Sequence, residues 1–271
     1  MTLLTAAGVL VGLWIAKVIG PRATSLRDVR EQPSVVWLMC AIITFLSASV
    51  GAGLAAQLVK VPWLLEKLGA GETQKNTMAM IGGGVLGIAV GAVFASLSAK
   101  AVPRAGLGLR WSDLWRGAVA LVIALPVIYA ASIGAMFAYE RLHGTRPDAA
   151  GHAILKSLRD EPSNPWHWAA AASAVVLAPV LEELVYRGFL QSALVRATGR
   201  AGLSIVLTTA VFTLMHVVGS SSVPWYSLPA IAVLGLSMGV AFERTGRLGV
   251  AIVMHVLFNG LNVALTAIGA G

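Results

Sequence analysis

The chain has 271 residues, of which 57% are hydrophobic and only 12% are charged, and its mean hydropathy is +0.80. Soluble domains carry about 25% charged residues, so this composition excludes a disordered, collagen-like, coiled-coil or disulfide-stabilised chain and predicts one polytopic membrane unit. The net charge of +8 is also typical of nucleic-acid-binding proteins, so the positions of the charges must decide between the two classes.

Eight apolar runs follow one another along the chain, each close to the length of about 20 residues that a helix needs to cross a bilayer. They lie near residues 2–19, 35–59, 78–97, 117–138, 166–195, 203–218, 225–242 and 248–268. Gly and Pro recur inside several runs, as is common in membrane helices. We therefore expect an all-α, polytopic bundle of about eight transmembrane helices.

The basic residues set the expected orientation, because Lys and Arg favour cytoplasmic loops. Of the 20 basic residues, 13 lie after or near the ends of spans 1, 3, 5 and 7. Acidic residues reduce the net charge of this set to +7, and that of the opposite set to +1. We therefore expect both termini outside the cytosol and no nucleic-acid partner. The 13 residues are Lys17, Arg22, Arg27, Arg30, Lys100, Arg104, Arg110, Arg116, Arg187, Arg196, Arg200, Arg244 and Arg247.

Polar side chains interrupt three of the four C-terminal spans, whereas residues 1–150 form N-terminal spans without a recognisable motif. An intramembrane charge costs at least a few kcal/mol, about 3 kcal/mol on insertion scales, and normally faces a bundle interior or a wet cavity. By contrast, His143, His152 and His167 lie in or beside the polar segment between the fourth and fifth spans, where solvation accounts for them. The intramembrane residues are Glu182, Glu183, Arg187, His216, His255 and Asn259.

The spacing of these residues predicts that they converge. Residues four apart share one face of a helix, so Glu183 and Arg187 are expected to pair, which lowers the cost of burying both. Counted at 1.5 Å per residue from the nearest cytosolic arginine, Glu182, His216 and Asn259 lie at similar depths of about 18 to 24 Å. His255 is shallower, at about 12 Å. Each polar residue alone has a structural explanation, as interhelical hydrogen bonding or a buried pair. Their matched depth indicates a shared site.

The chemistry of this set favours hydrolysis. A carboxylate in a low-dielectric cavity beside a second carboxylate becomes a stronger base, suited to activating water. His and Asn side chains hold water or donate hydrogen bonds to a developing oxyanion. The alternative is a zinc site formed by Glu182, His216 and His255, with the second glutamate as the base.

The ordered set Glu182-Glu183-x-x-x-Arg187, Phe212-x-x-x-His216 and His255-x-x-x-Asn259 resembles the CPBP family. This family comprises glutamate-type CAAX prenyl endopeptidases and bacteriocin-processing or immunity-related proteins, also called the ABI domain. The resemblance covers residues 166–268, the expected catalytic core. It implies an intramembrane protease, a type often called a metalloprotease.

The resemblance also implies a role for each motif residue. Glu182 corresponds to the glutamate that activates water, and Glu183 and Arg187 to its supporting acid and orienting arginine. The resemblance implies that His216 helps to bind or activate the water and that Asn259, beside His255, stabilises the oxyanion. A metal-free mechanism is favoured, because Asn259 is a hydrogen-bond donor rather than a strong zinc ligand.

We thus expect an intramembrane endopeptidase that cleaves a membrane-associated peptide or protein, whether or not that substrate is prenylated. Arg outnumbers Lys and Ala, Gly and Val are abundant, which suggests a high-GC bacterial source and hence the bacterial inner membrane. Two alternatives stay open: a non-catalytic binding, immunity or scaffold protein that retains the polar cluster, and a transporter with an intramembrane carboxylate. The sequence does not predict the oligomeric state.

Overall fold

The computed structural model describes residues 2–19, 32–63, 66, 71–101, 106–148, 151–218 and 223–269. All regular secondary structure in these ranges is helical, which confirms the all-α prediction. The long helices outside the motif segment are α1 (Thr2–Ile15), α2 (Ser34–Leu58), α4 (Glu72–Ala101) and α5 (Ser112–His143), followed by the short α6 (Ala153–Asp160). The motif segment consists of α7 (Pro165–Val175), α8 (Leu177–Glu183), the π-helix η2 (Leu184–Gln191), α9 (Ser192–Thr198), α10 (Ala201–Val218), the 3-10 helix η3 (Trp225–Ser227), α11 (Leu228–Thr245) and α12 (Leu248–Ala267).

Seven segments of the described chain are long and apolar enough to cross a membrane, with α7 to α9 counted as one continuous span. The eighth predicted span is present as α1, which has 14 residues and a length of about 21 Å. The hydrocarbon core of a bilayer is about 30 Å thick, so α1 is shorter than a full crossing. Among the basic residues used to predict orientation, Arg22, Arg27, Arg30 and Arg104 lie outside the described residues.

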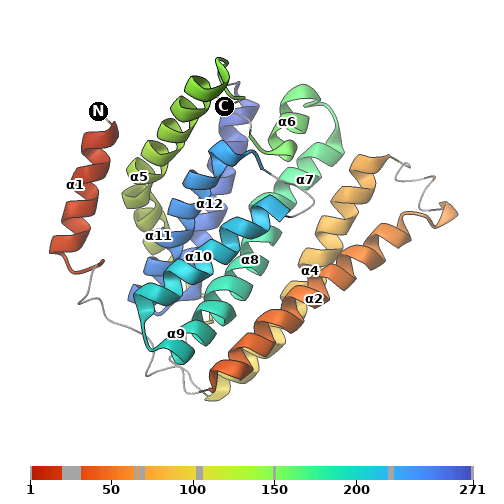
Figure 1. Cartoon of the computed structure of the whole chain (residues 1–271). Coiled ribbons are helices and arrows are strands. Elements are labelled where there is room, and N and C mark those ends of the chain that lie inside the picture. Colours follow the sequence, from red (N-terminus) through yellow and green to blue (C-terminus); the bar gives the residue numbers. More distant parts are fainter. Residues whose placement is uncertain are drawn as a thin grey trace.

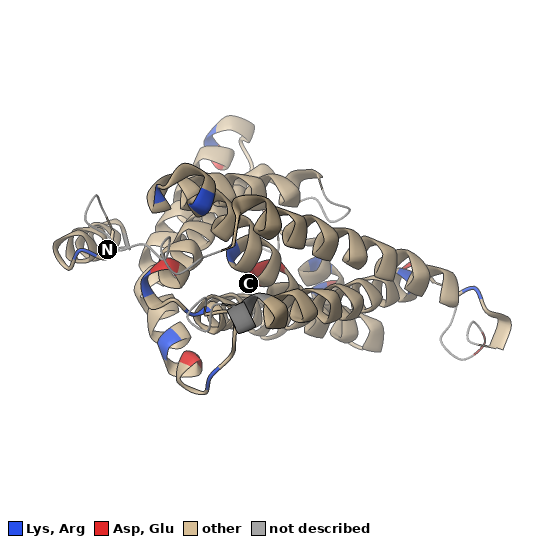
Figure 2. Cartoon of the chain, turned by 90° about the horizontal axis from the view of Figure 1, so that it is seen from below, with Lys and Arg blue, Asp and Glu red and all other residues tan. Residues whose placement is uncertain are grey.

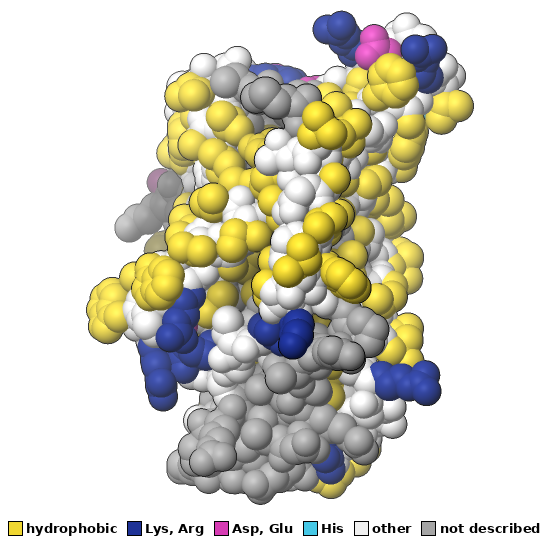
Figure 3. Space-filling view, turned by 90° about the vertical axis from the view of Figure 1, so that its left-hand side faces the viewer, with side chains coloured by type: hydrophobic (Ala, Val, Ile, Leu, Met, Phe, Trp, Pro, Cys, Tyr) yellow, Lys and Arg dark blue, Asp and Glu magenta, His cyan; other side chains and the backbone are white. Residues whose placement is uncertain are grey.

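The outer surface of the bundle is apolar, as a lipid-facing surface requires. Large side chains such as Leu54, Val93 and Ile133 are more than half exposed on different helices. Figure 3 shows a broad hydrophobic band, with Lys and Arg side chains at its lower margin and both charge types at one upper corner. In Figure 2 the ribbon is largely free of charged residues. An exposed apolar surface of this extent is unfavourable in water and marks contact with a membrane. Together with the seven long apolar segments, it indicates that the chain is an integral membrane protein.

Helices α2 and α4 form an antiparallel pair at one side of the bundle (Figure 1). Their backbones approach closely because glycines face each other: a Cβ atom on Gly51 would lie 2.4 Å from the carbonyl oxygen of Gly82. Small residues at such contacts are the usual means by which membrane helices associate, since lipid gives them no hydrophobic drive. The pair therefore packs as one unit.

Helix α4 also packs against the span that carries the two glutamates. A Cβ atom on Gly87 would lie 2.7 Å from the Leu181 side chain, and one on Gly91 would lie 2.4 Å from that of Leu184. Because Leu181 and Leu184 flank Glu182 and Glu183 in sequence, the glycines of α4 fix how closely the motif-free helices approach the motif.

A buried ion pair joins the two halves of the chain at the end of the bundle opposite the termini. Arg247, directly before α12, donates from Nη2 to Asp113 at the start of α5 at 2.8 Å, and also donates to the Gly108 carbonyl at 3.2 Å. Asp113 is 2% exposed. Nearby, the Leu248 amide donates to the Gly106 carbonyl at 2.8 Å. This connection fixes the position along the bundle at which α12 begins.

At the other end of the bundle, α6 and the chain before it cover the segment after α10. Tyr226 donates its hydroxyl hydrogen to the Asp148 carbonyl at 3.0 Å, and His152 accepts a hydrogen bond from the Ile154 amide at the start of α6. The expectation that solvation accounts for His167 is wrong: its side chain is buried in α7, with Nδ1 3.2 Å from the Glu161 carbonyl. A histidine one turn into an apolar helix is buried by its neighbours even when it follows a polar segment in sequence.

Candidate active site

The span that carries the two glutamates is not a regular helix. It breaks at Val176 (φ −115°, ψ −58°), three residues before Pro179, which lacks the N–H of a helix interior. From Leu184 to Gln191 it continues as a π-helix. Wide turns of this kind are rare and are frequently found at functional sites. Both irregularities flank Glu182 and Glu183, so this section of the span has its own geometry.

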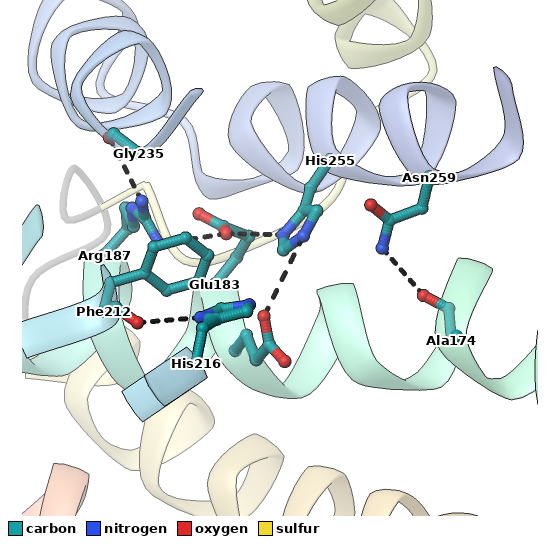
Figure 4. Close-up of polar contacts among 9 residues, drawn as sticks. Ala174, Glu183, Arg187, Phe212, His216, Gly235, His255 and Asn259 are labelled. Atoms are coloured by element: carbon teal, nitrogen blue, oxygen red, sulfur yellow. Dashed lines mark hydrogen bonds and ion pairs between the residues drawn. The ribbon is translucent and has the colours of Figure 1, made fainter. Parts of the chain in front are cut away.

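Glu183 lies at the centre of the polar cluster and is fully buried. Its Oε1 accepts a hydrogen bond from Nη1 of Arg187 at 3.1 Å and lies 2.9 Å from Nδ1 of His255 (Figure 4). A carboxylate is an acceptor, so His255 carries the hydrogen on Nδ1 and donates it to Glu183. One oxygen of Glu183 thus connects an arginine on its own span to a histidine on α12.

Arg187 is also fully buried and is held from two further directions. Its Nη2 donates to the carbonyl of Gly235 on α11 at 3.1 Å, and its guanidinium carbon lies 4.5 Å from the ring centre of Phe212 on α10. An isolated charge in such a position would be very unfavourable, but a paired and hydrogen-bonded one is tolerated. The cluster therefore draws on five elements: α8, η2, α10, α11 and α12, which contributes the histidine.

Glu182 differs from its neighbour in exposure. Its side chain is 29% exposed, whereas that of Glu183 is fully buried. Oε2 of Glu182 lies 3.9 Å from Nε2 of His255, the ring nitrogen that faces away from Glu183. That separation is too long for a direct hydrogen bond. Two adjacent carboxylates therefore occupy different environments, one accessible and one enclosed.

His216 completes this side of the cluster. Its Nδ1 lies 2.8 Å from the carbonyl of Phe212, one turn earlier on α10, so Nδ1 carries the hydrogen and Nε2 is an acceptor. The ring of Phe212 packs against both histidines, with centroids 4.7 Å from His216 and 5.9 Å from His255. Figure 4 shows the two histidines reaching the cluster from different helices, with Phe212 between Arg187 and the histidines.

Asn259 lies one turn beyond His255 on α12 and contacts the glutamate span beside its break at Val176. Its Nδ2 donates to the carbonyl of Ala174 at 2.9 Å, two residues before the break at Val176. An amide nitrogen has two hydrogens, so this bond uses one of them. Asn259 therefore both stabilises the irregular section of the span and retains a second donor hydrogen.

A comparison with known protein families bears on this arrangement. Residues 164–261 match the model of the family described as type II CAAX prenyl endopeptidase Rce1-like. This match covers the segment that carries the motifs and agrees with its predicted resemblance to the CPBP family. The matched segment begins at the N-cap of α7 and contains all six predicted site residues. No curated protein and no solved structure matches the chain.

The site residues of the described chain do not form a zinc-ligand set in this arrangement. Zinc in hydrolases is held by three protein ligands at about 2.0 to 2.2 Å. Within the described ranges, no three His, Cys, Asp or Glu side chains come together as such a set. Nδ1 of His216 is engaged with Phe212, and Nδ1 of His255 with Glu183, so only Nε2 of each ring is left for a ligand. The alternative set of Glu182, His216 and His255 therefore lacks the convergence that a metal requires.

The structure brings five of the six predicted residues into one contiguous cluster and joins the sixth, Asn259, to the same span. The predicted pair of Glu183 and Arg187 is present. One expectation about Arg187 is wrong: it is counted above with the cytosolic arginines, but it is fully buried beside Glu183. Pairing with Glu183 outweighs the tendency of arginine to reach the interface.

Two buried polar residues of this region were not predicted. Gln191 donates from Nε2 to the carbonyl of Gly239 and to Oε2 of Glu243, both at 3.1 Å. Gln191 follows Arg187 by four residues, as Arg187 follows Glu183. Extending the helical spacing by one more turn would have revealed it. Glu243 was placed with the cytosolic charges, although it is 3% exposed.

Proposed function

We propose that this CPBP-family protein is an intramembrane endopeptidase in which Glu182 activates a water molecule for attack on a peptide carbonyl. The observation that carries this proposal is the division between the two glutamates. Glu182 is partly exposed and free of a direct ion pair shorter than 3.9 Å among the described residues, while Glu183 is buried and engaged. A general base needs access to its substrate, and Glu182 has that access.

In the proposed reaction, Glu182 removes a proton from water as the water oxygen bonds to the peptide carbonyl carbon. The carbonyl oxygen becomes an oxyanion, for which Asn259 supplies its second N–H. The C–N bond then breaks, and the proton on Glu182 passes to the departing amine nitrogen. His216 accepts a hydrogen bond from the water through Nε2 and so orients it, since Nδ1 is occupied.

Glu183 and Arg187 support the reaction without touching the substrate. The buried carboxylate holds His255 through Nδ1 and so points Nε2 toward Glu182. This arrangement follows the general logic by which a buried acid sets the tautomer and orientation of a histidine. Arg187 balances the charge of Glu183 in a region where water cannot.

We propose a mechanism without a metal ion, supported by the donor set described above. Activity is expected to be unchanged after dialysis against a chelator, with metal content measured on the same preparation. Activity that falls with chelation and returns with zinc would overturn this part of the proposal.

We propose that the substrate is a membrane-associated peptide or protein and that the bilayer is the bacterial inner membrane, with both termini outside the cytosol. The basic residues near alternate span ends support this orientation. The CPBP match gives a farnesylated CAAX peptide as a first probe. Whether the natural substrate is prenylated is decided by comparing this probe with its unprenylated form.

The deciding experiment compares the wild type with Glu182→Gln in two assays: cleavage of an internally quenched farnesylated peptide in proteoliposomes, and peptide N-termini in membranes of expressing cells. Removal of a general base lowers the rate by about 10²- to 10⁴-fold. The matched control is Glu140→Gln, which changes an exposed glutamate on α5. Equal processing by wild type and Glu182→Gln would overturn the proposed function.

A further inference from the structure

The polar stripe of the glutamate span continues past the CPBP motif. Glu183, Arg187 and Gln191 follow one another at intervals of four residues, and all three are fully buried. The amide of Gln191 has two hydrogens, and both are used on α11, at the Gly239 carbonyl and at the Glu243 carboxylate. The proposed reaction assigns no role to Gln191 or Glu243, although both are buried polar groups that are costly to retain.

The contacts of this stripe with α11 have a constant offset. Arg187 bonds the carbonyl of Gly235, and Gln191 bonds the carbonyl of Gly239; each pair is 48 residues apart. Both helices run in the same direction, away from the end that holds the termini (Figure 1). Matching spacings of four residues on both helices form a ladder, so one relative position of η2 and α11 satisfies all its bonds together.

Glycines on α11 make this ladder possible at one position only. A Cβ atom on Gly235 would lie 3.3 Å from Nη2 of Arg187, and one on Gly239 would lie 3.1 Å from Oε1 of Gln191. A slip of one residue, which is a shift of about 1.5 Å along the axis with a rotation of about 100°, would bring Leu236 and Val240 to the positions of the glycines. Their side chains would then occupy the space of the guanidinium and the amide.

A backbone carbonyl alone does not define the position along α11, because every residue of the helix has one. Glu243 is the only acidic residue of α11, so its bond to Gln191 distinguishes the correct alignment from a slipped one. We propose that Gln191 and Glu243 are positioning residues, which hold η2 in register with α11 and thereby keep Arg187, Glu183 and His255 in their reactive arrangement. This inference rests on the proposed endopeptidase function.

Three variants test the inference. Gln191→Leu removes both hydrogen bonds, and Gln191→Glu opposes Glu243 with a second carboxylate. The double variant Gln191→Glu/Glu243→Gln restores a donor and an acceptor in exchanged positions. Ser192→Ala is the matched control, because Ser192 is equally buried on the same span but donates only to its own helix, at Gly188, 2.7 Å away.

Cleavage of the farnesylated probe by Gln191→Leu is expected to fall about tenfold or more, the loss produced by a hydrogen bond of about 1.4 kcal/mol. Its pH–rate profile is expected to move by about half a unit, since the alignment of Glu183 and His255 sets the charge around the base. A smaller folded fraction would scale the profile without moving it. Gln191→Glu is expected to lose more activity, and the double variant to regain part of it.

Hydrogen exchange of the η2 amides provides a readout that does not depend on the reaction. Exchange is expected to rise about tenfold in Gln191→Leu and to stay at the wild-type level in Ser192→Ala. If Glu182→Gln still cleaves the probe, the proposed function fails. The positioning role is then tested by hydrogen exchange of the η2 amides in Gln191→Leu alone. If Glu182→Gln is inactive but Gln191→Leu keeps the wild-type profile and exchange, the positioning role is overturned. If Gln191→Leu does not fold, absence of rescue in the double variant overturns it.

Discussion

Arg187 and Glu183 depend on each other, because both are withdrawn completely from solvent and lipid. Each of their bonds, to His255, Gly235 and one another, is between 2.9 and 3.1 Å long. Removing one partner of such a pair leaves the other charge buried without compensation, which costs more than the pair contributes in the first place. The two residues are therefore expected to behave as one unit in mutagenesis.

This interdependence predicts a non-additive result. Arg187→Met is expected to lower the free energy of unfolding by about 3 to 5 kcal/mol, because Glu183 is left as an uncompensated charge. The double variant Glu183→Gln/Arg187→Met is expected to be more stable than Arg187→Met alone. Unfolding in mixed micelles measures both. A double variant as unstable as the sum of the single variants would contradict the coupling.

His152 gives the end of the bundle that holds the termini a dependence on pH. Burial lowers the pKa of His152 below its usual value of 6.5. The unfolded chain therefore binds a proton at higher pH than the folded one, so the stability present above pH 6.5 is lost as the pH falls below that value. Protonation also removes the acceptor that caps α6.

The matching variant is His152→Asn, since asparagine is a good N-cap and does not titrate. The melting temperature of the wild type is expected to fall more than that of His152→Asn between about pH 7.5 and pH 5. Two melting curves that shift in parallel over this range would show that His152 does not control the effect.

Among the individual site residues, the sequence predicted the contacts that depend on helical spacing. Glu183 and Arg187 pair as expected because residues four apart meet on any helix turn. The sequence could not show which of the two glutamates is accessible, since adjacent residues are separated only by the rotation of a helix that here is irregular. The partner of Asn259 was also beyond prediction, because Ala174 contributes its backbone rather than its side chain.

The helix elements show where close packing is required. Gly51 and Gly53 are two residues apart on α2, but only Gly51 faces α4. Gly51→Ala is expected to lower the free energy of unfolding by about 1 to 3 kcal/mol, because its Cβ meets the backbone of Gly82. Gly53→Ala is the control, since a Cβ atom there has nothing within 4 Å. Equal stabilities of the two variants would show that α2 and α4 are not closely packed.

Hydropathy predicted the elements well where they cross the apolar layer and poorly elsewhere. The long spans follow from runs of apolar residues, whose burial in lipid needs no detailed partner. The short α6 lies in a polar segment, and its pattern over eight residues is too brief to separate from a loop. The π-helix is invisible to a helical wheel, because its wider turn depends on contacts with neighbouring helices rather than on its own residues.

For the molecule as a whole, the spans without a motif hold the spans that carry the site residues in position. Helices α2 and α4 pack against the glutamate span, and α5 anchors the start of α12 through Asp113 and Arg247. The sequence suggested a division into a motif-free segment and a core, because sequence motifs reveal reactive polar residues and do not reveal packing contacts. The contacts that position the core include glycines of α4 and the ion pair between Asp113 in the first half of the chain and Arg247 in the second.

This anchoring predicts unequal effects of two aspartates. Asp113→Ala is expected to destabilise the protein by about 3 kcal/mol or more, because Arg247 loses its partner at a buried site. Asp160→Ala removes an exposed contact with Arg159 and is expected to cost less than about 1 kcal/mol. Thermal unfolding of both variants in the same lipid nanodiscs tests the difference. Similar melting temperatures would contradict the anchoring role.

The burial of Cys40 makes the chain a ready background for chemical labelling. Its thiol is the only one in the sequence and is 6% exposed, so a cysteine introduced elsewhere reacts almost alone. Ile268→Cys and Trp111→Cys are suited to this purpose, since the native side chains are 76% and 89% exposed at opposite ends of the bundle. An impermeant maleimide added to intact cells is expected to modify Ile268→Cys and to spare Trp111→Cys. The reverse pattern would show that the molecule has the opposite orientation, with the end of the bundle that carries Trp111 outside the cell.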